Sequence, residues 1–88
     1  MKPVLLQAVA RQELRDSTAW YRERNPKVAD RFVREVQRAL ELIERFPALG
    51  TRTPLITGKA RQLPIAGFPY HIVFEEMPDR IEVLAIPK

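Results

Sequence analysis

The residues best suited to chemistry in this chain are one histidine, the tyrosine beside it and several cations. His71 and Tyr70 have side chains that can move protons. Four basic residues near them in the sequence can hold the negative charge of a phosphate: Lys59, Arg61, Arg80 and Lys88. These residue types are the ones that proton transfer at a phosphate ester would need.

The spacing of these residues does not favour a catalytic site. Side chains alternate between the two faces of a strand, so His71 shares a face with Val73 and Glu75 and lies opposite Tyr70. The sequence has no Ser-His-Asp order, no glycine-rich phosphate loop and no cluster of metal-ligating residues. We therefore interpret His71 as an exposed or hydrogen-bonded bystander, and we expect no metal site and no cofactor.

Composition indicates a small globular domain. The 88 residues are 45% hydrophobic and 30% charged, which allows one modest core. There is no cysteine, so disulfides and thiolate metal sites are excluded. No apolar run approaches the roughly 18 residues of a membrane span, and Gln7 interrupts the first apolar run too early for a secretion signal. We expect a single domain over residues 1–88, located in the cytoplasm.

The charge is positive and uneven along the chain. Fifteen basic and eleven acidic residues give a net charge of +4, which favours nucleic acid or an acidic protein segment as partner. Residues 51–61 contain Arg52, Lys59 and Arg61 without an acid, whereas residues 75–82 are mainly acidic. The basic segment has no interleaved aromatic residues that would stack on bases, so we expect no sequence-specific nucleic-acid binding by this chain alone.

Two helices are predicted in the first half of the chain. The first carries a stripe at Ala10, Leu14, Ser17 and Tyr21. Residues 25 and 26, Asn-Pro, mark a new start, because asparagine caps a helix and proline fits its first position.

The second helix has the clearer periodicity and ends at Pro47. Apolar residues recur at spacings of three and four: Ala29, Phe32, Val36, Ala39 or Leu40, Ile43 and Phe46. Three ion pairs are expected on its wet side, namely Asp30–Arg34, Arg31–Glu35 and Glu41–Arg45. The short link between the helices predicts an antiparallel hairpin.

Strands are predicted before and after the helices. Residues 3–6 suggest a first strand, and β-branched and aromatic runs predict an antiparallel meander over 60–65, 69–75 and 80–86. Residues 48–59 are predicted to form a loop. Pro64 cannot donate to a strand ladder, so its strand should lie at an edge or end there. The order β-αα-βββ predicts an α+β fold in which a helix hairpin packs on a small antiparallel sheet.

Three stretches of the sequence resemble a known family. They are an Asn-Pro restart feeding "ADRF" at residues 29–32, "FPALG" at 46–50 and "FPYHIVF" at 68–74. In this order and spacing they resemble the ParE branch of the RelE/ParE toxin superfamily, the toxins of bacterial type II toxin–antitoxin pairs. The resemblance runs from about Pro3 to Ile86, nearly the whole chain, and implies the RelE/ParE-like fold.

The resemblance to the ParE branch implies a plasmid-stabilisation toxin that acts by binding. Its target would be DNA gyrase, trapped on cleaved DNA. Its neutralising partner would be a ParD-like antitoxin, with a ribbon-helix-helix domain and a C-terminal segment that wraps the toxin. On the exposed edges of the predicted hairpin, Trp20, Arg31 and Arg38 are our candidates for antitoxin contacts.

Two alternatives remain open from the sequence. One is a RelE-type ribosome-dependent mRNA endoribonuclease, with Lys59, Arg61, His71 and Arg80 as its catalytic set. Many relatives continue past the last strand with basic and aromatic residues, which serve catalysis in the RNA-cutting branch, whereas this sequence has only "AIPK". That difference favours binding over catalysis. It also allows the second alternative, a non-toxic member that only binds an antitoxin.

Overall fold

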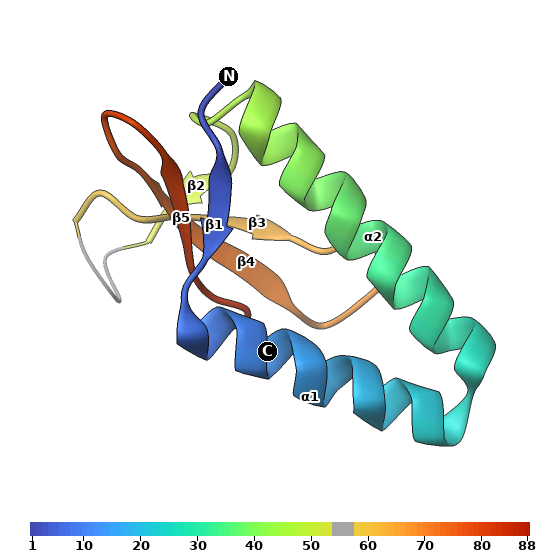
Figure 1. Cartoon of the computed structure of the whole chain (residues 1–88). Coiled ribbons are helices and arrows are strands. Elements are labelled where there is room, and N and C mark those ends of the chain that lie inside the picture. The colour runs from blue at the N-terminus through green and yellow to red at the C-terminus, as the bar shows by residue number, and fades with distance from the viewer. Residues whose placement is uncertain (54–57) are drawn as a thin grey trace.

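Two helices cover one face of a five-stranded sheet in the computed structural model, which describes residues 1–53 and 58–88 (Figure 1). In chain order the elements are β1 (Val4–Leu6), α1 (Ala8–Arg24), α2 (Pro26–Arg45), β2 (Thr51–Arg52), β3 (Arg61–Pro64), β4 (His71–Glu76) and β5 (Ile81–Ala85). The predicted α+β class and the helix hairpin on a small sheet are confirmed. Within the described ranges, neither helix has both the length and the apolar character needed to cross a membrane.

The sheet is mixed and has the strand order β1-β5-β4-β3-β2. The meander of β3, β4 and β5 is antiparallel, as predicted, while β1 adds to β5 in parallel. The strand β2 lies inside the segment predicted to be a loop. It has two residues and pairs with β3 through Thr51 and Arg52. So short a strand leaves no periodicity in the sequence, because its structure comes from the partner strand.

Asn25 is both the end of α1 and the start of α2. Its backbone N–H donates to the Tyr21 carbonyl at 2.7 Å, which closes α1. Its side-chain oxygen accepts from the Lys27 N–H at 3.1 Å, and Pro26 follows as the first residue of α2. This is the predicted cap. With a single residue between them, the two helices meet at one end of the molecule and diverge toward the other (Figure 1).

The core lies between the helices and the sheet. The predicted stripe of α2 is buried at Ala29, Phe32, Val36, Ala39 and Ile43. Tyr70, Ile72 and Phe74 share the sheet face beneath it, as strand alternation predicts. Four rings form its aromatic part, with centroids 5.0 to 6.4 Å apart: Tyr21, Phe32, Phe68 and Tyr70. Burial, followed by the charge of Tyr70, raises the pKa of Tyr21 above its usual value.

Two details of α2 differ from the prediction. Phe46 is 57% exposed, because it is the residue at which the backbone leaves the helix, with φ −132°, and the periodicity no longer directs its side chain. The three predicted i,i+4 ion pairs do not form among the described residues. Asp30 pairs with Arg22 of α1 and Glu35 pairs with Arg38 instead. Exposed pairs contribute little free energy, so sequence spacing decides poorly which ones form.

Pro64 and Gly50 determine how the backbone runs near β2. Pro64 is the last residue of β3, and β2 pairs only with Arg61 and Gln62, so the missing N–H of the proline breaks no ladder. Gly50 precedes β2 with φ +86°, and a Cβ there would lie 2.4 Å from the Gln62 carbonyl oxygen. A glycine is therefore required for β2 to approach β3.

Truncation of two phenylalanines of this region should separate core from surface. Phe32 is fully buried and Phe46 is exposed. Phe32→Ala should lower the free energy of unfolding by about 3 kcal/mol or more, because it removes a ring from a packed core and leaves a cavity. Phe46→Ala should lower it by less than about 0.5 kcal/mol. Urea unfolding followed by circular dichroism measures both, and equal losses would contradict this description of the core.

Candidate functional site

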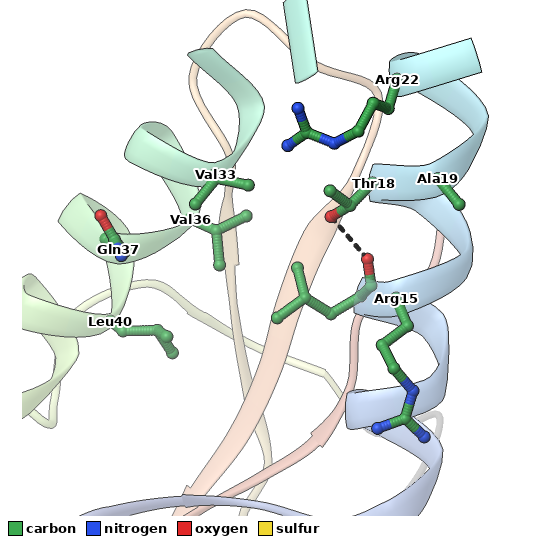
Figure 2. A pocket seen from close by; sticks show the side chains of 9 residues that line it. Arg15, Thr18, Ala19, Arg22, Val33, Val36, Gln37 and Leu40 are labelled. Carbon is green, nitrogen blue, oxygen red and sulfur yellow. Dashed lines mark hydrogen bonds between the residues drawn. The ribbon is translucent and has the colours of Figure 1, made fainter. Parts of the chain in front are cut away.

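A groove of about 540 Å³ lies between α1 and α2. Its floor is apolar. Val33, Val36 and Leu40 point from α2 toward α1 (Figure 2), and Leu14 lines the opposite wall. The hydroxyl of Thr18 donates to the Leu14 carbonyl at 2.7 Å, so this polar group is already satisfied within α1. The groove thus has the character of an unfilled apolar site that remains open to solvent.

The rim of the groove is cationic on the α1 side only. Arg15 and Arg22 stand along α1, whereas α2 contributes the neutral Gln37. Arg22 lies 3.3 Å from the Asp30 carboxylate, and both side chains are exposed, so solvent weakens their attraction. Arg15 donates to the side-chain oxygen of Gln12 at 2.9 Å. The rim therefore favours a partner whose acidic residues lie along α1.

The groove was not among the sequence predictions, although a signal for it exists. Val33, Val36 and Leu40 fall at spacings of three and four, which makes the apolar arc of α2 wider than one packed stripe. The prediction allowed either Ala39 or Leu40 in the core stripe. The structure buries Ala39 and leaves Leu40 half-buried in the groove. A helix whose apolar arc is wider than the stripe that packs on the core indicates such a groove.

The candidate nuclease residues are not brought together. Tyr70 is buried on the helix side of the sheet, while His71 begins β4 on the opposite face and its backbone N–H donates to the Pro87 carbonyl. Arg61 pairs in register with Phe74, farther along β4. Arg80 lies beyond the far end of β4, about 20 Å from His71 at 3.3 Å per strand residue. This set therefore forms no common centre.

The four basic residues named with His71 and Tyr70 lie in different places. Arg80 donates to Glu82 and to Asp79, each at 2.7 Å, and the Glu82 bond, followed by the Asp79 bond, raises the pKa of Arg80 above its usual value. Arg61 donates to the Gly50 carbonyl at 3.3 Å. Lys59 is exposed in the turn before β3. Lys88 lies with its ammonium 5.6 Å from the centre of the Tyr70 ring.

None of the three residues proposed for antitoxin contact lines the groove. Trp20 is 47% exposed on α1, with the Arg24 guanidinium 3.8 Å above its ring. Arg31 and Arg38 are both exposed on α2. Spacings of two residues from Val33 and Leu40 place them on a different side of that helix from the groove.

Comparison with known proteins identifies the family. The family model described as "ParE toxin of type II toxin-antitoxin system, parDE" matches residues 4–88. The chain belongs to the ParE toxin family. The resemblance inferred from the sequence is confirmed, and the chain is a ParE toxin of a type II toxin–antitoxin system.

The fold of this ParE toxin is also similar to a solved structure. The structure described as "Chromosomal ParDE TA system from P. aeruginosa" superposes with a TM-score of 0.83 and covers 100% of this chain and 96% of that one. The sequence identity is 18%, so this likeness concerns the fold. Comparison with curated protein sequences gave no match.

Proposed function

We propose that this ParE toxin arrests growth by binding DNA gyrase on cleaved DNA, and that a ParD-like antitoxin neutralises it. Membership of the family supports the gyrase target. The observation that carries the proposal is the separation of Tyr70 and His71 on opposite faces of the sheet, with Arg61 on β3 and Arg80 beyond the far end of β4. Among the described residues, the groove is suited to binding another macromolecule, whereas the candidate nuclease residues form no common centre.

We assign the antitoxin to the groove between the helices. An apolar floor flanked by two arginines suits an amphipathic helix with acidic residues along one side of its apolar face. Such a helix would also be attracted over a distance by the net charge of +4. Trp20 lies outside the groove and we keep it as a separate contact, because a half-exposed tryptophan is a frequent anchor in interfaces.

A carboxylate in the floor of the groove should weaken the antitoxin complex. Val33→Asp would place a carboxylate in an apolar contact that excludes water, and we expect an affinity loss of about 100-fold. Val28→Asp is the matched control, since Val28 is also half-buried on α2 but does not line the groove. Calorimetric titration with the cognate ParD-like antitoxin measures both variants. Equal losses in the two would argue against the groove.

Trp20→Ala should weaken the same complex more than it weakens the isolated fold. The ring is half-exposed, so its loss should cost the antitoxin complex about 2 kcal/mol and cost folding clearly less. Phe46→Ala, which removes another exposed ring, is the control. Titration and urea unfolding on the same preparations give the two quantities. If both fall by the same amount, Trp20 is an ordinary packing residue.

The target can be tested with purified gyrase, ATP and supercoiled plasmid. The toxin should cause linear DNA to accumulate after protease treatment, because a trapped enzyme holds its DNA cleaved. Preincubation with the antitoxin should abolish the effect. Absence of linear DNA at toxin concentrations that arrest growth would remove gyrase as the target. Codon-positioned cuts in translated mRNA that disappear in Arg61→Ala would establish the ribonuclease instead.

A further inference from the structure

The outer face of α2 carries a row of five cations that is interrupted once, by Glu41. Lys27, Arg31, Arg34, Arg38 and Arg45 follow one another at spacings of four, three, four and seven residues. At 3.6 residues per turn these spacings return to the same side of a helix. All five side chains are exposed. We call this row the basic ridge.

The basic ridge runs along nearly the whole of α2, on the side away from the core. The buried stripe of the helix is formed by Phe32, Val36, Ala39 and Ile43, each of which is offset from the ridge positions by roughly half a turn. Eighteen residues separate the first and last cations, which corresponds to about 27 Å at 1.5 Å per residue. The ridge is therefore a long convex surface that faces solvent.

The four acids of α2 compensate its five cations only in part. In the described part of the chain, Arg38 is the ridge residue with a carboxylate at ion-pair distance, 3.7 Å from Glu35. Asp30, which the sequence pattern assigned to Arg34, pairs with Arg22 of α1 instead. Glu41 lies in the row between Arg38 and Arg45, so five cations and one acid give the row a net charge of +4. The ridge can therefore still attract a partner with regularly spaced negative charge.

The shape and chemistry of the ridge favour double-stranded DNA over other polyanions. An acidic peptide needs an apolar groove or anchor as well as charge, and the row holds only charged residues, the five cations and Glu41. Single-stranded nucleic acid is usually held by stacking on aromatic rings, which the ridge positions lack. The major groove of an RNA duplex is too narrow for a helix, whereas that of B-form DNA, about 12 Å wide, admits one.

We propose that the basic ridge of α2 binds the phosphate backbone of B-form DNA without reading its sequence. Phosphate contacts need only charge and reach, which arginine supplies well. The contact goes beyond binding of gyrase, since an inhibitor can bind that enzyme without touching DNA. The proposed DNA contact does not depend on gyrase being the target of the toxin, because it needs only the ridge. The groove lies on another side of α2, so an occupied groove leaves the ridge exposed.

Binding to a fluorescent 20-base-pair duplex of arbitrary sequence tests the proposal. Anisotropy titrations between 50 and 200 mM salt should give a log–log slope of about −4.5, because each of the five ridge cations that neutralises a phosphate contributes about −0.9. Replacing Arg34, Arg38 and Arg45 together by glutamine should reduce the slope to about −2 and weaken binding at 50 mM salt by about tenfold or more.

A matched control lies on α1. Arg11, Arg15 and Arg22 have the same spacings of four and seven residues as the three replaced arginines, and their replacement by glutamine changes the net charge equally. This control should bind DNA within about threefold of the original protein, because its arginines lie outside the ridge. If the ridge triple variant does not fold, Arg34→Gln alone should make the negative slope less steep by about 0.9.

Three results would overturn the proposal. The first is no binding of the original protein to the duplex at 50 mM salt. The second is equal weakening by the ridge and control variants, which would mean that only net charge matters. The third is tighter binding to polyglutamate, or to an RNA duplex of the same sequence, than to DNA. Loss confined to the ridge variant, with DNA preferred to both competitors, would support it.

Discussion

The rest of this structure depends on which side of α2 faces the sheet. Phe32 and Ile43 are fully buried against the sheet, and withdrawing either from the core would cost several kcal/mol, so the helix has one rotational setting. In that setting Val33 and Leu40 face α1, while Arg34 faces solvent. The core, the groove and the basic ridge are therefore three sides of one helix, separated by steps of 100° per residue.

The position of α1 completes the groove. Asn25 leaves a single residue for the connection, and its two hydrogen bonds close one helix and open the next at the same point. The helices diverge from this junction (Figure 1), and apolar side chains on their facing sides line the groove. An exposed apolar groove of this kind usually marks an interaction site. In a toxin that a partner must neutralise, such a groove is available from the outset, because it needs no rearrangement of the core.

The location of the two proposed surfaces has a consequence for regulation. An antitoxin helix in the groove would contact Val33 and the rim arginines of α1, whereas DNA would contact the opposite part of α2. Neutralisation of the toxin and contact with DNA can then occur in one complex. The acidic hairpin between β4 and β5 holds Arg80 through its own carboxylates, so this cation adds nothing to the ridge.

Much of the fold was predictable because it follows from local chemistry. The cap at Asn25, the stripe of α2 and the alternation of Tyr70, Ile72 and Phe74 depend on neighbours in the sequence, and all three are confirmed. The strand β2 and the direction of Phe46 were not predictable. A two-residue strand takes its structure from β3, and a side chain at a helix end follows the backbone that leaves the helix.

The sequence by itself determined the α+β class, the helix hairpin and the family, because periodicity, capping and motif order are written in residue types. Only the tertiary structure decided which cations and aromatic residues share a surface. It brought Tyr21, Phe32 and Tyr70 together, left Leu40 in the groove while burying Ala39, and left the cations of α2 exposed to solvent. The physical reason is that a surface is formed by elements packed together, and the angle at which they pack depends on the whole core.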